Sequence, residues 1–376
     1  MRPFGTTIFS EMSALALRTG AVNLGQGFPD SDGPREIVDA VTAAMHAGAN
    51  QYAPLPGVPE LRAAIADHQR VHYGLEVDPD AGVQVTFGAT EAIAAAMLGL
   101  LEPGDEVVVL EPFYDSYAAT IAMAGARRRT VTLRAPDFAV DLDAVAAAAV
   151  GARMLLLNSP HNPTGRVLAR SELEAIARIC VEHDLIAVTD EVYEHLVFEG
   201  EHVPLATLPG MAQRTLTISS AGKTLSFTGW KVGWCSGPAE LVSAVRSAKQ
   251  FLSFAGATPF QHAVAGALPD VERHVEPLRA RLRAGRDRLC EGLRAAGFGV
   301  SVPAGGYFVN ADAAPLGCED ARELCRELAE RAGVVAIPSS AFYDDAEAGR
   351  TLVRFTFCKR MEVVEEAVAR LTAMAR

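Results

Sequence analysis

Short, nearly continuous apolar runs alternate with helical segments through the middle of the chain. The apolar runs, residues 83–87, 107–110, 154–157, 185–189 and 215–218, have the length and composition of strands. Residues 92–101 and 172–183, which lie between such runs, are expected to be helices. Strands that are apolar along their whole length and are separated by helices form a mainly parallel sheet covered on both faces. The pattern therefore predicts an α/β fold.

The ends of the chain carry the elements of a second, smaller α/β domain. Its expected strands are residues 298–302, 307–310 and 352–357, and its expected helices are residues 319–332 and 362–374. Helices are also expected at residues 34–47, 59–73 and 238–254 and within the Arg-rich stretch 258–297. We expect a large domain of residues 49–276 and a small domain of residues 1–48 and 277–376.

Composition argues against several classes of protein. The 376 residues carry a net charge of -12, so a surface for nucleic acid is not expected. The cysteines form no C-x-x-C pair, and neither a metal site nor a disulfide framework is predicted. Residues 1–10 lack the pattern of a secretion signal, and no apolar run reaches the ~18 residues of a membrane helix. We expect a cytoplasmic protein that captures small anions.

Polar residues follow the ends of the expected strands. They are Thr90, Tyr114, Asn162, Asp190, Ser220 and Lys223. Ligands of mainly parallel sheets bind at the carboxyl ends of the strands. We therefore expect these side chains to meet in one site.

The segment Ser219–Trp234 is the densest part of this pattern. It places Lys223 among small residues and Lys231 between two tryptophans. Gly222-Lys223-Thr224 is similar to the end of a nucleoside triphosphate loop, but such a loop needs a glycine where this chain has Thr217. A surface lysine on a turn would explain neither the small residues nor the second lysine.

The chemistry of these residues points to one cofactor. A lysine at a strand end can form a Schiff base with an aldehyde. Asp190 ends an apolar strand and needs a cationic partner, such as a protonated pyridine nitrogen. Ala89 and Thr90 open a helix whose N–H groups can bind a phosphate. Ser220 and Lys231 add a hydroxyl and a positive charge. Aldehyde, pyridine and phosphate together indicate pyridoxal 5′-phosphate.

Several motifs together resemble the class I/II, fold-type I, pyridoxal-phosphate-dependent aminotransferases. They are Ser220-x-x-Lys223 followed by Lys231, Asn162-Pro163-x-Gly165, Asp190-x-x-Tyr193, Gly88-Ala89-Thr90-Glu91 and Arg354. The segments 24–30, 111–117 and 229–234 are similar to the branch of kynurenine/glutamine and methionine aminotransferases. The chain also resembles actinobacterial proteins assigned as N-succinyldiaminopimelate aminotransferases. The resemblance implies transfer of an amino group between an amino acid and a 2-oxo acid such as 2-oxoglutarate.

The resemblance also implies roles in holding the cofactor. Lys223 would bind it covalently and move the substrate proton, with Asp190 and Tyr193 as the other catalytic residues. Asp190 would keep the pyridine nitrogen protonated, and Asn162 and Tyr193 would hydrogen-bond the 3′-oxygen. The remaining cofactor contacts are implied for Ala89, Thr90, Tyr114, Ser220 and Lys231, of which Tyr114 would stack on the ring.

Substrate contacts and the oligomeric state follow from the same resemblance. Arg354 would clamp the α-carboxylate, assisted by Asn162 and the Gly27 backbone. In the family, a residue equivalent to Tyr52 reaches the phosphate of the neighbouring subunit, and Phe254 would line the neighbour's pocket. A homodimer with shared active sites is therefore implied.

Other interpretations stay open on the sequence alone. Singly, Asp190 would be interpreted as a helix cap and Arg354 as half of an ion pair. His161 and His195 are interpreted as structural, because nothing positions either one for catalysis. A pyridoxal-phosphate-dependent carbon–sulfur β-lyase shares the early chemistry of an aminotransferase. A cofactor-binding regulator is disfavoured, because residues 1–23 are too short and weakly basic to bind DNA. The substrate stays open too, since Arg354 reads only a group common to all amino acids.

Overall fold

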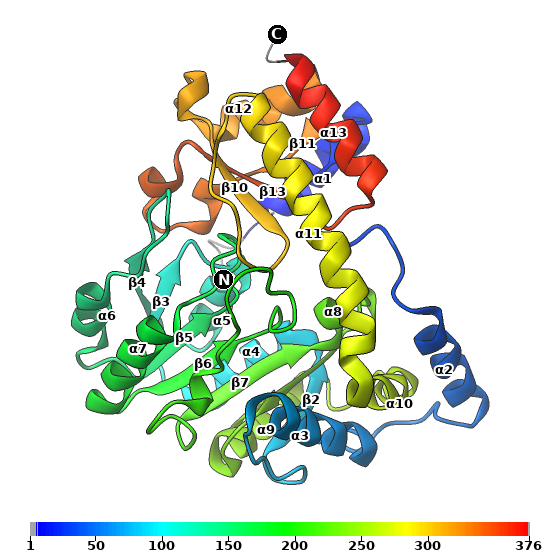
Figure 1. The fold of residues 1–376 in the computed structure, drawn as a ribbon. Coiled ribbons are helices and arrows are strands. Elements are labelled where there is room, and N and C mark those ends of the chain that lie inside the picture. The colour runs from blue at the N-terminus through cyan, green and yellow to red at the C-terminus, as the bar shows by residue number, and fades with distance from the viewer. Residues whose placement is uncertain (1–4, 6, 375–376) are drawn as a thin grey trace.

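A seven-stranded sheet is the frame of the molecule. The computed structural model describes residue 5 and residues 7–374. The strands pair in the order β2-β8-β7-β6-β5-β3-β4, and all run in the same direction except β8, which is antiparallel to both β2 and β7. Their bounds are β2 Val83–Phe87, β3 Glu106–Glu111, β4 Arg127–Thr132, β5 Met154–Asn158, β6 Ile186–Asp190, β7 Thr215–Ser220 and β8 Val232–Ser236. The predicted α/β fold with a mainly parallel sheet is confirmed (Figure 1).

Helices cover both faces of this sheet. Val107 and Val109 of β3 pack against one helical layer, while Val108 and Leu110 pack against the other. The first layer holds α4 (Gly88–Leu100), α5 (Asp115–Met123) and α9 (Ala239–Leu252), and the second holds α6 (Leu142–Ala149) and α7 (Arg170–Glu182). Burial on both sides explains why the strands are nearly continuous apolar runs.

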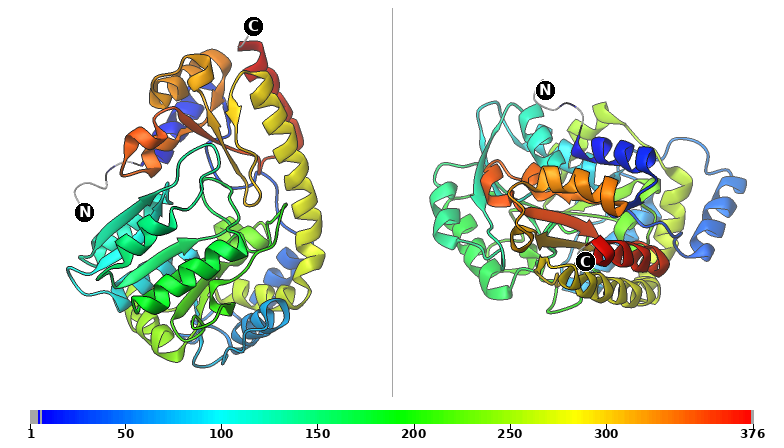
Figure 2. Two further views of the ribbon diagram at one scale, coloured as in Figure 1. Left: turned by 60° about the vertical axis from the view of Figure 1, so that its left-hand side comes forward. Right: turned by 90° about the horizontal axis from the view of Figure 1, so that it is seen from above.

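A smaller α/β part is built from both ends of the chain (Figures 1 and 2). Its antiparallel sheet has the order β12-β13-β10-β9, and β1 pairs with β11. The strands are β1 Val22–Asn23, β9 Gly299–Val300, β10 Phe308–Asp312, β11 Val334–Val335, β12 Ile337–Pro338 and β13 Leu352–Thr356. The helices beside them are α1 (Ile8–Thr19), α12 (Ala321–Glu327) and α13 (Met361–Met374).

Two helical regions connect the parts. The long helix α11 (Val271–Ala295) runs beside both of them and continues unbroken through residue 277 (Figure 2). Helices α2 (Arg35–His46) and α3 (Pro59–Tyr73) both pack on α10 (Thr258–Ala267). The domain boundaries at residues 48/49 and 276/277 therefore stay a prediction. Within the described residues, no helix combines the length and apolarity that crossing a bilayer requires.

The structure corrects several predicted elements. Strands β4 and β8 were missed, because β4 is a polar edge strand of consecutive arginines and β8 begins directly after the loop at Lys231. The helix expected at residues 92–101 begins earlier, at Gly88, and in its first turn the Glu91 carboxylate accepts the Phe87 N–H at 2.7 Å. The helix expected at residues 319–332 changes after Glu327 into a wider π-helical turn.

Candidate active site

A cavity of about 420 Å³ opens at the carboxyl edge of the parallel strands. The small part closes it from the other side through Gly27, Phe308 and Arg354. Its walls bring together the predicted residues Gly27, Ala89, Thr90, Tyr114, Asn162, Asp190, Tyr193, Ser220, Lys223, Lys231 and Arg354. The polar residues that follow separate strands therefore do converge.

Lys223 lies in the short helix α8 (Ala221–Thr224), directly after β7. Its Nζ donates to the Tyr307 hydroxyl at 2.5 Å and to the Gly27 carbonyl at 3.3 Å. Burial lowers the pKa of Lys223 to about 8. A much larger share of this amine is therefore neutral near pH 8 than of an ordinary lysine, as a nucleophile or a base requires.

Asp190 is the last residue of β6 and is buried. Its carboxylate accepts the Tyr117 hydroxyl at 2.6 Å and the Val192 N–H at 3.4 Å. Burial raises the pKa of Asp190 to about 6. Since no Lys or Arg of the described residues pairs with it, this carboxylate would be stabilised by a cationic ligand.

Lys231 reaches the cavity because β8 runs antiparallel to its neighbours, so the start of β8 lies at the carboxyl edge of the others. Its backbone is left-handed, with φ of 55°, and its Nζ lies 3.5 Å from Thr90 Oγ1 at the start of α4. A Cβ on Gly233 would come within 2.4 Å of the Gly88 backbone, so this close packing requires glycine. A helix N-terminus and an ammonium thus face the same space, which suits a phosphate.

Arg354 is a buried residue of β13. Its guanidinium donates to Asn162 Oδ1 at 3.3 Å and to the Gly25 carbonyl at 3.0 Å, while Nε has no partner among the described residues. The rings of Phe308 and Phe342 lie 4.1 and 4.7 Å from its Cζ atom. Burial lowers the pKa of Arg354 to about 10, so the side chain stays cationic at neutral pH. It forms no ion pair with any described carboxylate.

Comparison with known proteins gives the family. The sequence model described as aminotransferase class I and II matches residues 19–371. The chain belongs to this family. Aminotransferases of this class use pyridoxal phosphate, and the cavity suits that cofactor, because it presents a buried carboxylate, a lysine of lowered pKa and a helix N-terminus beside a second lysine.

Individual aminotransferases are similar over nearly their whole length. The chain is 55% identical to the probable N-succinyldiaminopimelate aminotransferase DapC of Mycobacterium tuberculosis, covering 100% of this chain and 98% of that protein. It is 39% identical to the methionine aminotransferase of Escherichia coli K12, covering 98% and 95%. The solved structure of N-succinyldiaminopimelate aminotransferase from Mycobacterium tuberculosis superposes with a TM-score of 0.97 at 56% identity, covering 99% of this chain and 98% of that one.

Four residues discussed from the sequence, Tyr52, Phe254, His161 and His195, lie outside the aminotransferase cavity. The Tyr52 side chain is 80% exposed and meets Phe254 edge-on, with 5.6 Å between ring centroids. His161 is buried against Thr164, with 2.8 Å between Nδ1 and Oγ1. His195 is buried against His68, behind the cavity. Neither histidine lines the cavity.

The aminotransferase site also contains residues that the sequence had not indicated. Tyr307 contacts both Lys223 and the Gly27 carbonyl, the latter at 2.7 Å. Tyr117 donates to Asp190, and its position three residues after Tyr114 on a helix was the available signal. Phe9 lies over Arg354, with 5.0 Å between Cζ and the ring centroid. No local pattern marks Tyr307 or Phe9, because they come from the other part of the molecule.

Proposed function

We propose that Arg354 and Lys223 define the two ends of the substrate site in this aminotransferase. Arg354 binds the α-carboxylate of the amino acid, and Lys223 moves the proton at its Cα. The observation that carries this proposal is the buried Arg354 guanidinium, which has neutral acceptors but no carboxylate partner. A bidentate pair with a carboxylate is among the strong interactions that a guanidinium can make.

The cofactor contacts follow from the same cavity. Pyridoxal phosphate supplies an electron sink when it is bound. Ala89, Thr90, Ser220 and Lys231 would bind its phosphate. Asp190 would pair with the ring nitrogen, Asn162 and Tyr193 would hydrogen-bond the 3′-oxygen, and Tyr114 would cover the ring face.

Lys223 can act as the base because its amine is held at the edge of the cavity. The Tyr307 hydroxyl and the Gly27 carbonyl accept hydrogen bonds from this amine and so fix its direction. Tyr117 fixes the Asp190 carboxylate in the same way. Arg354, held by Asn162, orients the substrate so that its Cα proton faces Lys223.

We further propose that the amino acid is N-succinyl-2,6-diaminopimelate and the 2-oxo acid is 2-oxoglutarate. The support is the relative of that name, which is 55% identical and matches the entire chain. Methionine is the second candidate, from the 39% identical relative. The test is a panel of amino donors that includes N-succinyl-2,6-diaminopimelate, methionine, glutamine and kynurenine, with glutamate formation from 2-oxoglutarate as the readout.

The succinylated donor is expected to give the highest kcat/KM of the panel. A higher value for methionine or kynurenine would overturn the substrate assignment and leave the transamination assignment intact. Release of pyruvate and ammonia from cystathionine, without any 2-oxo acid, would instead indicate a carbon–sulfur β-lyase.

A homodimer with shared sites is part of this proposal. Its support is a group of exposed aromatic side chains, with Tyr52 80%, Phe251 84% and Phe254 44% exposed. In a dimer, Tyr52 would reach the phosphate in the neighbour's cavity. Sedimentation should give the mass of two chains. Mixing the inactive variants Lys223→Ala and Tyr52→Ala should restore activity, because a mixed dimer contains one intact site; no recovery would contradict shared sites.

We place the enzyme in the cytoplasm. Its cysteines are all free thiols, which suits a reducing compartment. Cell fractionation with an antibody against the chain tests this location.

A further inference from the structure

A second cluster of titratable side chains lies behind the active-site cavity. His68 comes from α3, and Glu194 and His195 come from the segment after β6. All three are buried, and one nitrogen or oxygen atom from each lies within 4.8 Å of the others. The Nε2 atoms of His68 and His195 face each other at 2.7 Å.

We propose that His68, Glu194 and His195 form a binding site for one divalent transition-metal ion of the zinc class. Two imidazole nitrogens and a carboxylate oxygen are a donor set that zinc accepts, with a fourth position left for water. No step of the proposed transamination uses these residues, so the ion would take no part in that reaction.

The two imidazole rings must separate and tilt to accept the ion. Zinc–nitrogen bonds of about 2.0–2.1 Å at a tetrahedral angle separate two nitrogens by roughly 3.3 Å. The two imidazole nitrogens, now 2.7 Å apart, would therefore move apart by about 0.6 Å. Because the ring centroids are 5.0 Å apart, the two Nε2 atoms point almost directly at each other, so both rings would also tilt until their lone pairs converge on the ion. In doing so they would exchange one shared proton for the metal.

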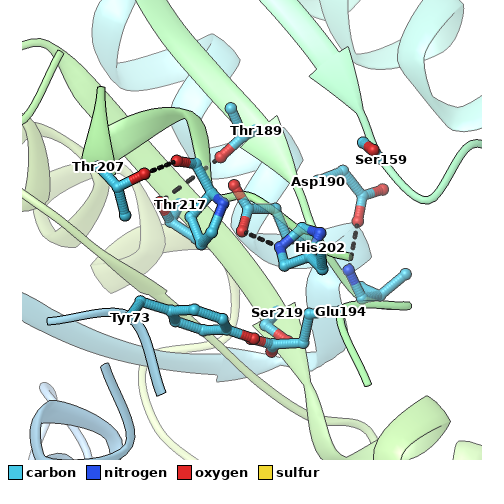
Figure 3. Close-up of polar contacts among 12 residues, drawn as sticks. Tyr73, Ser159, Thr189, Asp190, Glu194, His202, Thr207, Thr217 and Ser219 are labelled. Atoms are coloured by element: carbon cyan, nitrogen blue, oxygen red, sulfur yellow. Dashed lines mark hydrogen bonds and ion pairs between the residues drawn. The ribbon is translucent and has the colours of Figure 1, made fainter. Parts of the chain in front are cut away.

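Glu194 keeps lone pairs for a metal although its carboxylate is already held. Its Oε2 accepts the Tyr73 hydroxyl at 2.6 Å, and its Oε1 accepts the Ser219 hydroxyl. Figure 3 shows Tyr73 and Ser219 meeting at this carboxylate beside β7. Each carboxylate oxygen can accept a second partner. The two hydroxyls therefore fix the orientation of the carboxylate without saturating it.

Glu272 orients the His195 ring from the other side. Its Oε1 lies 3.5 Å from His195 Nδ1, and Arg279 donates to its Oε2 at 3.2 Å. A carboxylate on Nδ1 favours the tautomer whose Nε2 lone pair is free, as is usual for metal-bound histidine.

Charge also favours a cation. Glu194 is a buried carboxylate that forms no ion pair with a lysine or arginine in the described part of the chain. A buried charge of this kind is stabilised by a cation beside it. No ammonium or guanidinium therefore competes with a metal ion for this carboxylate.

The ion has a route to the cluster. A cavity of about 320 Å³ lies beside it and is lined by His72, Tyr73, Glu194, His195, Glu272 and Arg279, among others. This space can also hold the water that completes a tetrahedral site. The segment after β6 thus has two sides, since Asp190 and Tyr193 line the active-site cavity whereas Glu194 and His195 line this one.

The test uses the pyridoxal-phosphate-loaded enzyme after treatment with a chelator. Titration with ZnCl₂, followed by desalting and elemental analysis, should give one zinc per chain. Co²⁺ added in its place should show the visible absorption of tetrahedral cobalt. His68→Gln and Glu194→Gln should each weaken zinc binding by at least about 100-fold. His202→Gln is the matched control, because His202 is also buried but pairs with Glu191 at 2.8 Å.

The results separate the possibilities clearly. Zinc should raise the melting temperature of the wild type and of His202→Gln but not of the two ligand variants. Absence of zinc from the wild type after titration would overturn the site. Equal zinc retention in Glu194→Gln would do the same, and circular dichroism of each variant ensures that only folded protein is compared.

Discussion

Arg354 and Arg286 are both buried, and each guanidinium lies over an aromatic ring, yet their electrostatic surroundings differ. Arg286, where α11 meets the rest of the chain, pairs with Glu199 at 3.0 Å and Asp287 at 2.8 Å. Arg354, in the active-site cavity, has only neutral oxygen acceptors. One buried charge is balanced by the protein, and the other is not.

The presence or absence of an anionic partner distinguishes a buried arginine of the structural framework from one of the active site. Burying a cation without an anion is costly, so a fold tolerates it where a ligand brings the missing charge. The same holds for Asp190, a buried carboxylate beside the cavity without a lysine or arginine pair among the described residues. In the described part of the chain, the cavity thus contains an unpaired carboxylate at Asp190 and unpaired cationic side chains at Arg354 and Lys231, which suits a zwitterionic amino acid, a pyridinium ring and a phosphate.

Lys223→Ala changes a residue of the site and should have the largest effect on activity. Covalent cofactor attachment and proton transfer both depend on this amine, so transamination should fall by at least about 10³-fold. The readout is glutamate formation from 2-oxoglutarate, with cofactor absorbance showing that the variant still binds pyridoxal phosphate noncovalently. A variant that turns over at even a tenth of the wild-type rate would refute the role of Lys223.

Arg354→Lys tests whether this arginine, which has no anionic partner in the residues that the structure describes, binds the substrate carboxylate. A lysine keeps the charge but loses the planar bidentate fork, so kcat/KM for the amino donor should fall by about 10²-fold, mainly through KM. Steady-state kinetics with the best donor of the panel measure this split. An unchanged KM would mean that another group holds the carboxylate.

The lowered pKa of Lys223 predicts a pH dependence of cofactor capture. The neutral amine is the nucleophile, and with a pKa of about 8 its fraction rises about tenfold between pH 7 and pH 9 and then levels off. Stopped-flow absorbance after mixing the cofactor-free enzyme with pyridoxal phosphate gives the rate. An ordinary lysine would behave differently, because its neutral fraction would keep rising to about pH 10.4.

The sequence predicted the parts of the site that follow directly from strands. Asp190 and Lys223 each come just after an apolar run, so their place at the carboxyl edge follows from sheet topology. Tyr307 was missed because it lies 84 residues beyond Lys223 and reaches it from the small part of the molecule. Strand β8 was missed as well, although its reversed direction is what brings Lys231 to the cavity.

The cluster of His68, Glu194 and His195 is a clearer example of a site that the sequence could not predict. His68 and His195 are 127 residues apart and form no linear metal motif. The prediction of no metal site rested on cysteine spacing. Only the packing of α3 against the segment after β6 brings His68, Glu194 and His195 together. Pairings over such distances depend on tertiary contacts that local patterns do not encode.

Arg286→Lys is the matched partner of Arg354→Lys and should have the smallest effect. The guanidinium donates to Glu199, Asp287 and the Pro303 carbonyl, and a lysine can replace only part of this set. Because Glu199 and Asp287 have side chains 62% and 58% exposed, they stay hydrated when unpaired. The loss should be about 1–2 kcal/mol, which lowers the melting temperature by a few degrees.

The kinetic parameters of Arg286→Lys should stay at wild-type values, because the residue balances charge far from the substrate carboxylate. Thermal melting and steady-state kinetics on the same preparation check both halves of this expectation. A KM increase as large as that of Arg354→Lys would show that α11 positions the substrate site, and the division between a balanced framework arginine and an unbalanced site arginine would then fail.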